Sequence, residues 1–259
     1  YVADPAANRI VVFDAATKAQ IAAVTVGAFP NRIAINPAGT RVYVAGLLSA
    51  TISVIDAATN TVITNMAVPG LATGASIIQG MVVNPDGTRL YVAATTSIIP
   101  SLTIIDTATN AVTGNVDLNS VPWGGVAMNQ DGTRIYLPTI SGLAVINATT
   151  NTVITTINTA VAPLGFDFGK SVAVNPAGTR VYMTDIGTGM VSIIDASLNR
   201  LLNTVAVSKP SGVAFSPTGT YAYVSSADIV AGSIAVFDTA TNAITATIPI
   251  DGSAVAIAR

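Results

Sequence analysis

The chain has 259 residues, of which 51% are hydrophobic and only 9% are charged, and its formal net charge is −2. The 11 basic residues are scattered without runs, so the chain lacks the electrostatic footprint of a nucleic-acid or anionic-membrane binder. It contains no Cys and no His, and all 13 acidic residues are Asp. These absences exclude zinc sites made of Cys and His, and the Ser–His–Asp and Cys–His nucleophile pairs.

The apolar residues come in short runs, none near the ~20 residues that a membrane-spanning helix needs. Val, Ile, Ala, Thr, Asn and Gly are abundant, which favours strands and turns. The sequence begins without Met and without a signal-peptide pattern, which predicts a processed or trimmed product.

A nine-residue phrase recurs along the chain and predicts a tight hairpin. From Asn36 it reads Asn-Pro-Ala-Gly-Thr-Arg-Val-Tyr-Val. Pro fixes φ at the first corner of the turn, Gly supplies a positive φ, and the last residues begin the next strand. Equivalent phrases begin at Asn84, Asn129, Asn175 and, in weaker form, Ser216, and their glycines lie 48, 45, 46 and 41 residues apart.

A second hairpin phrase follows the first in every repeat. In the segment Ile52 to Ile63 it is built around Asp56-Ala-Ala-Thr-Asn60. A short Asp or Asn side chain can bond the backbone two residues on, and Asn tolerates the left-handed region. Equivalents begin at Asp14, Asp106, Asn147, Asp195 and Asp238.

Each repeat therefore contains four predicted strands, and six repeats fill the chain. In the last full repeat the strands are 212–216, 221–225, 233–238 and 243–248. Four short antiparallel strands bury both faces when such sheets pack around an axis, so we expect an all-β, six-bladed β-propeller in a single domain, 1–259. Segment 252–257 resembles an innermost strand, and the chain opens inside a repeat at Tyr1. We therefore expect the C-terminal strand to pair with the N-terminal blade and close the ring.

The strand phrases also carry a family resemblance. Tyr1-Val-Ala-Asp, Tyr91-Val-Ala-Ala and Tyr182-Met-Thr-Asp, with the Pro-x-Gly-Thr-Arg and Ile-Asp-x-Ala-Thr-Asn turns, resemble the YVTN-type β-propeller repeat family over essentially the whole chain. The resemblance implies an extracellular, cell-surface or periplasmic location, because that family includes archaeal surface-layer proteins and bacterial secreted proteins. The Gly-His and Trp-Asp signatures of WD40 propellers are missing.

Propeller connectivity puts the two regular hairpins on one face and the irregular connections on the other. Variation concentrates in the irregular connections, so we expect ligand contacts there. Arg32, Gln79, Lys170 and Ser211 directly precede predicted innermost strands and are expected to ring the mouth of the central channel. The candidate ligand-binding residues are Arg32, Gln79, Trp123, Phe166, Asp167, Lys170, Asp185 and Lys209.

Structural roles are the alternative for these residues. Trp123 and Phe166 could cap the space between blades, and Arg32 and Lys170 could solvate a rim. The recurring Asp residues are expected in turns, and the sequon that starts at Asn147 lies inside a hairpin phrase. No acidic loop of the calcium-binding type occurs, so we predict no metal and no cofactor.

The predicted function is a non-catalytic binding or assembly module whose irregular loops contact a protein, glycan or cell-envelope ligand. The low charge also favours self-association into layers or filaments, and neither nucleic acid nor membrane insertion is expected. The alternative is a lactonase-like hydrolase with an Asp-based site in the central channel, with or without calcium, drawn from Asp167, Asp185, Arg32 and Lys170. A lyase of the virginiamycin type would need His and Glu. An idealised repeat protein with no ligand is a third hypothesis, and uneven loops and a single Trp123 argue against it.

Overall fold

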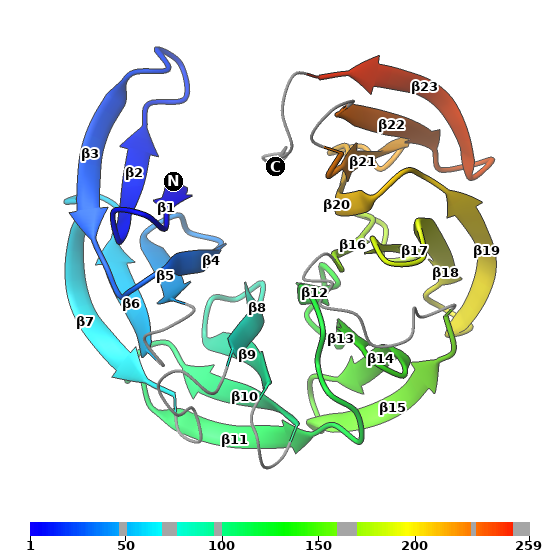
Figure 1. Ribbon diagram of the computed structural model, residues 1–259. Coiled ribbons are helices and arrows are strands. Elements are labelled where there is room, and N and C mark those ends of the chain that lie inside the picture. Colours follow the sequence, from blue (N-terminus) through cyan, green and yellow to red (C-terminus); the bar gives the residue numbers. More distant parts are fainter. Residues whose placement is uncertain (47–50, 69–76, 96–99, 160–169, 229–231, 251–259) are drawn as a thin grey trace. The chain divides into compact units, whose positions relative to one another are not determined.

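The structure is a computed structural model that describes residues 1–46, 51–68, 77–95, 100–159, 170–228 and 232–250 (Figure 1). The chain divides into two compact units, Tyr1–Asn119 and Ser120–Arg259. Every regular element among the described residues is a β-strand. A helix long and apolar enough to cross a membrane is therefore not found in this part of the chain.

The first unit contains three antiparallel sheets, which we call blades 1 to 3. Each is a meander in which consecutive strands pair. Blade 1 consists of β1 (Val2–Asp4), β2 (Arg9–Phe13) and β3 (Gln20–Thr25). Blade 2 consists of β4 (Pro30–Ile35), β5 (Arg41–Gly46), β6 (Thr51–Asp56) and β7 (Thr61–Ala67). Blade 3 consists of β8 (Ile77–Val83), β9 (Arg89–Thr95), β10 (Ser101–Asp106) and β11 (Val112–Asp117).

The second unit contains blades 4 to 6, with the same meander order. Blade 4 consists of β12 (Ala127–Met128), β13 (Arg134–Thr139), β14 (Gly142–Asn147) and β15 (Thr152–Ile157). Blade 5 consists of β16 (Val172–Val174), β17 (Arg180–Asp185), β18 (Met190–Asp195) and β19 (Arg200–Ala206). Blade 6 consists of β20 (Pro210–Phe215), β21 (Tyr221–Ser226), β22 (Ser233–Asp238) and β23 (Ala243–Pro249).

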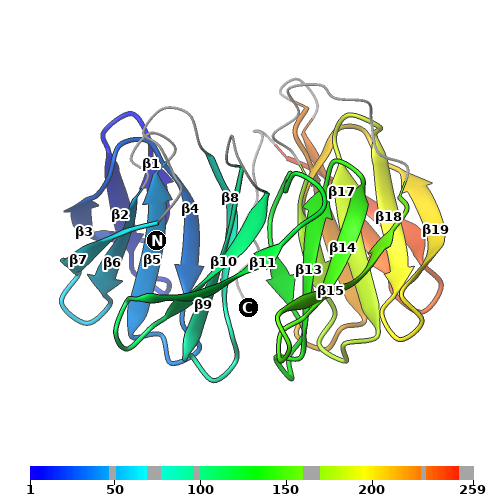
Figure 2. The same ribbon diagram turned by 90° about the horizontal axis from the view of Figure 1, so that it is seen from below.

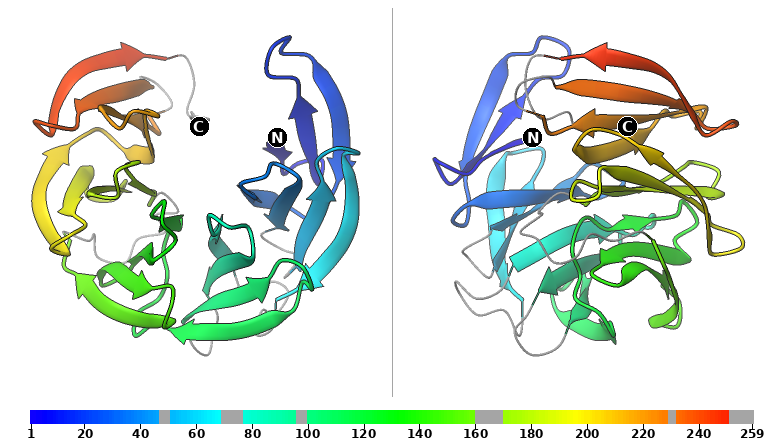
Figure 3. Two further views of the ribbon diagram at one scale, coloured as in Figure 1. Left: turned by 180° about the vertical axis from the view of Figure 1, so that it is seen from behind. Right: turned by 45° about the vertical axis from the view of Figure 1, so that its right-hand side comes forward.

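These sheets confirm the predicted fold class, the six antiparallel blades of a β-propeller. Within each unit, the first strands of neighbouring blades contact one another, as β4 does with β8 and β16 with β20, and Figure 3 shows the long last strands at the opposite edge. Blade 1 has three described strands. The fourth strand expected for it, 252–257, lies outside the described residues. The single domain stays a prediction.

The first regular hairpin has the predicted turn chemistry. In blade 2, Gly39 adopts a φ of 67°, and Oδ1 of Asn36 accepts hydrogen bonds from the backbone N–H groups of Thr40 and Arg41. The Asn side chain therefore satisfies backbone N–H groups of the turn that would otherwise lack an acceptor within the hairpin. Asn175 accepts the same two bonds, whereas Asn84 and Asn129 accept only the Arg N–H, because Asp86 and Asp131 take the Thr N–H.

The second regular hairpin is held by its leading Asp. Oδ1 of Asp56 accepts the N–H groups of Ala58 and Thr59 and the hydroxyl of Thr59, and Asn60 closes the turn at a φ of 54°. Left-handed backbone suits Asn better than most side chains, which explains its recurrence at this position. The sequence interpretation of these Asp residues as turn formers is confirmed.

The two regular hairpins of a blade bond to each other. In blade 2, the N–H of Ala57 donates to the carbonyl of Thr40 at 3.0 Å. The equivalent bonds in the later blades join Thr107 to Thr88, Ala148 to Thr133, Ala196 to Thr179, and Thr239 to Thr220. Both hairpins therefore lie at the same end of the strands, as Figure 2 shows for the blades of each unit. We call this the regular end, and the opposite end, with the variable connections, the irregular end.

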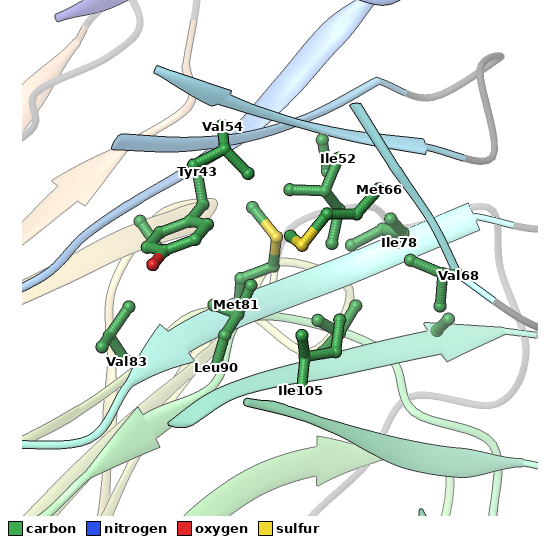
Figure 4. Close-up of a cluster of buried hydrophobic side chains, with 14 residues drawn as sticks. Tyr43, Ile52, Val54, Met66, Val68, Ile78, Met81, Val83, Leu90 and Ile105 are labelled. Atoms are coloured by element: carbon green, nitrogen blue, oxygen red, sulfur yellow. The ribbon is translucent and has the colours of Figure 1, made fainter. Parts of the chain in front are cut away.

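Neighbouring blades pack face to face through aliphatic clusters. Figure 4 shows the cluster between blades 2 and 3, in which Met66 and Ile52 of one blade meet Met81 and Ile78 of the other. Ile52 is fully buried, and Ile78 is 2% exposed. Similar clusters join blades 1 and 2, 4 and 5, and 5 and 6. Burial of these β-branched and long side chains supplies the main stabilisation of each unit.

Candidate functional site

In blades 2, 3 and 6, the first strand begins at the irregular end with one extra residue. In blade 2, Pro30 pairs with Gly46 and Arg32 pairs with Ala45, so Asn31 is a bulge. Gln79 occupies the same position in blade 3 and Ser211 in blade 6. The side chains of Gln79 and Ser211 turn into their own blades, in keeping with the usual effect of a β-bulge on side-chain direction.

Lys170 and Asp185 form the most buried ion pair of the described residues. Nζ of Lys170 lies 3.3 Å from Oδ2 of Asp185, and the two side chains are 4% and 2% exposed. Oδ1 of Asp185 accepts the N–H groups of Gly187 and Thr188. The carbonyl of Lys170 accepts the N–H of Gly125 from blade 4. Lys170 therefore connects blade 4 through its backbone with blade 5 through its side chain.

Gly124 shows how closely blade 4 approaches Lys170. Gly124 has a φ of 150°, and a Cβ added there would lie 2.6 Å from the carbonyl oxygen of Lys170. Any larger residue would push the two backbones apart. The glycine is thus required by the contact that positions the ion pair.

Gln79 and Ser211 also bond inside their own blades. Nε2 of Gln79 donates to the hydroxyl of Thr95 at 3.2 Å, and Gln79 is 2% exposed. The hydroxyl of Ser211 lies 3.2 Å from that of Ser225, whose Oγ also accepts the N–H of Gly212. Both side chains brace the irregular end of a blade.

Arg32 lies partly buried at the start of β4, one residue beyond the bulge. Nε of Arg32 donates to the carbonyl of Gln79 in blade 3, and Nη1 donates to the carbonyl of Asn31 at 3.0 Å. Burial lowers the pKa of Arg32. The structure thus brings Arg32 and Gln79 together, but through the backbone of Gln79 and not through its amide.

Lys209 is an exposed candidate with a weak partner. Its ammonium lies 3.8 Å from Oδ2 of Asp228, and the Lys209 side chain is 55% exposed. Lys209 precedes Pro210 and has a φ of 44°. Phe29 precedes Pro30 in blade 2 with a φ of 53° and is 46% exposed. Left-handed backbone at Lys and Phe is uncommon, and such positions cluster at functional sites.

The remaining candidates are Trp123, Phe166 and Asp167. Trp123 is partly buried in the segment before β12, where its backbone N–H donates to the carbonyl of Pro138. Phe166 and Asp167 lie outside the described residues. Among the residues that are described, no three acidic side chains converge as they would around a metal ion.

Sequence reasoning missed Thr184 and Asn31. Thr184 is fully buried, and its Oγ1 accepts the N–H of Ser171, which ties β17 to the segment before β16. The signal was available in the phrase Tyr182-Met-Thr-Asp, where a Thr stands beside the candidate Asp185. Asn31 carried no signal, because it bonds Arg32 through its backbone carbonyl and its bulge is invisible in strand alternation.

Comparison with known proteins supports the fold and assigns no family. No family model and no curated protein matches the chain. Among solved structures, the chain is similar to Kuenenia stuttgartiensis hydrazine synthase, with a TM-score of 0.58 and 17% identity over 90% of each chain. At that identity the similarity concerns the fold alone.

Proposed function

We propose that this chain is a non-catalytic binding and assembly module of the YVTN-repeat type that acts outside the cytoplasm. It contacts a protein, glycan or cell-envelope ligand through the irregular end of its blades. The observation that carries this proposal is that both oxygens of the Asp185 carboxylate contact the protein itself. Oδ1 accepts two backbone N–H groups, and Oδ2 faces Lys170. A catalytic acid or base must come within hydrogen-bond distance of its substrate. Asp185 is 1% exposed, so its carboxylate serves the blade instead.

The contrast between the two ends of the strands supports the same proposal. At the regular end, Asp56 and its equivalents repeat one set of backbone bonds in blade after blade. At the irregular end, Phe29 and Lys209 hold exposed side chains in an unfavourable backbone conformation, whereas the left-handed position of the second regular hairpin is Asn except for Lys18 in blade 1. A strained position persists where the surrounding structure and the function both favour it.

The last strands of the blades support the assembly part of the proposal. In the described part of the chain β7 pairs only with β6, and Ile63 of this strand is 46% exposed. Asp117 and Arg200 are the only charged residues in the six last strands. Soluble proteins usually protect such edges with Lys or other charges. Edge-to-edge association of copies is the expected consequence.

Binding assays with loop variants test the proposal. The protein is screened against cell-wall fragments, glycans and peptides, and Trp123→Ala and Lys209→Ala are compared with Lys18→Ala at the regular end. We expect the first two variants to weaken binding and Lys18→Ala to leave it unchanged. Binding that responds only to Lys18→Ala would place recognition at the other end of the blades.

A lactone-hydrolysis assay with and without calcium tests the alternative, a lactonase-like hydrolase. Our proposal predicts no turnover of gluconolactone above the buffer rate. Calcium-dependent turnover that Asp185→Asn abolishes would overturn it in favour of the hydrolase.

A further inference from the structure

Arg32 departs from the repeat at a position where blades 3, 5 and 6 carry small residues. Its partner in the strand register is Ala45, and the corresponding residues are Gly80 in blade 3 and Gly212 in blade 6. In blade 5 the position is Ser171, whose carbonyl accepts the N–H of Thr184. The fold therefore needs no large side chain here. A guanidinium at this position calls for a reason other than blade packing.

The guanidinium is held in a fixed orientation by two backbone carbonyls. Nε donates to Gln79 and Nη1 donates to Asn31. Three of the five guanidinium N–H groups, two on Nη2 and one on Nη1, therefore remain for a ligand. Neither carbonyl carries a charge. The bonds therefore orient the cation without neutralising it.

In the described part of the chain, no carboxylate pairs with Arg32. Among the described residues, no salt bridge to Arg32 is formed, whereas Lys170 of the second unit, which directly precedes the corresponding residue Ser171, faces Asp185. Asp4 pairs with Arg9 at 2.9 Å. The Asp residues at 14, 56, 86 and 106 bind their own turns at the regular end, and Asp117 ends the last strand of blade 3. The segments 47–50, 69–76 and 96–99 contain no acidic residue.

A partly buried cation without a counter-charge is costly, and an anion that binds it recovers the cost. We propose that Arg32 is the recognition residue for a carboxylate-bearing ligand at the irregular end of blade 2. This proposal rests on the binding function proposed above and adds the ligand class. The two terminal nitrogens match the two oxygens of a planar carboxylate. Phe29, exposed at the same end of β4, supplies an apolar surface for the ring or chain that bears it.

The test is an NMR titration of the whole chain labelled with nitrogen-15. Sodium benzoate and sodium glucuronate are the probes, and benzamide and glucose are their neutral counterparts at matched ionic strength. We expect the carboxylates to shift the Arg32 Nε–H signal and the backbone signals of Asn31 and Gln79. The neutral counterparts are expected to leave these signals in place. Equal shifts with inorganic phosphate would overturn the carboxylate assignment.

Arg32→Gln and Arg9→Gln are the matched variants. The first keeps a side-chain donor for the Gln79 carbonyl and removes the charge, while Arg9 is a surface Arg of the same unit that already has a carboxylate partner. We expect R32Q to weaken carboxylate binding at least about tenfold and R9Q to leave it unchanged. If R32Q does not fold, R32K replaces it, since Lys keeps the charge without the planar fork. Binding of wild-type strength in either Arg32 variant would overturn the proposal.

The outcomes separate this proposal from the proposed function. If the protein binds cell-wall fragments and ignores both carboxylates, the Arg32 proposal is wrong and the binding function stands. If both carboxylates bind through Arg32 while no fragment, glycan or peptide of the panel binds, the carboxylate site stands and the proposed function is wrong.

Discussion

The hydroxyl of Tyr182 donates a hydrogen bond of 2.9 Å to Oδ1 of Asn242, which lies 60 residues further along the chain in the neighbouring blade. Tyr182 is fully buried, and its ring meets Phe215 and Phe237 edge-on at 5.0 and 5.7 Å. Asn242 is the left-handed residue of a regular hairpin. The Tyr of one repeat thus bonds the Asn of the next, and Tyr1 does the same with Asn60 at 3.2 Å.

Tyr182→Phe should destabilise the protein by about 1–2 kcal/mol, because it leaves the partly buried Asn242 side chain without its donor. Tyr136→Phe is the matched control. Tyr136 is equally buried, but its hydroxyl has no hydrogen-bond partner in the described part of the chain. Removing that hydroxyl should be neutral or stabilising. Urea unfolding of both variants measures the difference, and equal losses would contradict the role given to the Tyr182 bond.

Stability should fall at alkaline pH through Tyr182. Burial raises its pKa to about 12, whereas an unfolded Tyr titrates near pH 10. The contribution is therefore fully present below about pH 10 and is lost as pH rises from there toward 12. Burial also raises the pKa values of Tyr43 and Tyr136, so absorbance titration of the native protein should show several late-ionising Tyr residues and one fewer in Tyr182→Phe.

Acid should weaken the second regular hairpin. The backbone N–H and hydroxyl of Thr59 lower the pKa of Asp56 by bonding its carboxylate. A lowered folded pKa gives stability that is present above the unfolded value of about 3.9 and is lost as pH falls through the folded value. Asp56→Asn should reduce the loss of unfolding free energy at low pH, which we call the acid limb. Asn147 already holds the same turn in blade 4 without a charge.

The reciprocal variant, Asn147→Asp, should steepen the acid limb. Chemical denaturation between pH 2 and 6 measures both slopes. An unchanged slope in both variants would mean that the hairpin carboxylates do not govern acid stability.

Breaking the buried ion pair should be severe. Lys170→Met leaves the Asp185 carboxylate buried without its cation, which costs about 3–5 kcal/mol. Lys170→Met with Asp185→Asn should recover part of this loss, since Asn keeps an oxygen for the N–H groups of Gly187 and Thr188. A double-mutant cycle on unfolding free energies from urea titrations gives the interaction energy between Lys170 and Asp185. Additive losses would show that the two charges do not interact.

Lys18→Asn should stabilise blade 1. Lys18 has a φ of 62° at the hairpin position that Asn60 and its equivalents occupy elsewhere. Asn tolerates this conformation better, so we expect a gain of about 0.5–1 kcal/mol. Lys18→Ala, which removes the side chain but keeps the strained backbone, should show no gain. A similar gain from Lys18→Ala would assign the effect to the lysine side chain.

The repeats made the strands and regular hairpins predictable, because turn chemistry there is local. Gly39 and Asp56 do what their sequence neighbours imply. Strand ends were less certain: β20 begins at Pro210, two residues before the expected start, because the strand continues through a bulge. The sequence suggests that Arg32, Gln79 and Lys170 occupy equivalent positions. The strand register shows that Gln79 is the bulge residue of its strand, whereas Arg32 follows the bulge residue Asn31.

The partners of the candidate residues could not be predicted, because they depend on contacts between distant strands. Lys170 and Asp185 belong to separate segments of one repeat, and only the pairing of β16 with β17 brings them together. The Arg32 contact depends likewise on the position of β8 beside β4.

The bond from Ala57 to Thr40 joins the two regular hairpins of one blade, so the regular end of that blade is held by residues of its own repeat. A gene segment that encodes one repeat carries both hairpins and the bond between them, so its duplication adds a unit that already holds its own turns. The opposite end is free of that constraint. Successive copies can therefore differ in their connections while remaining compatible with their neighbours, as Arg32 differs from Gly80 and Gly212 at the same strand position.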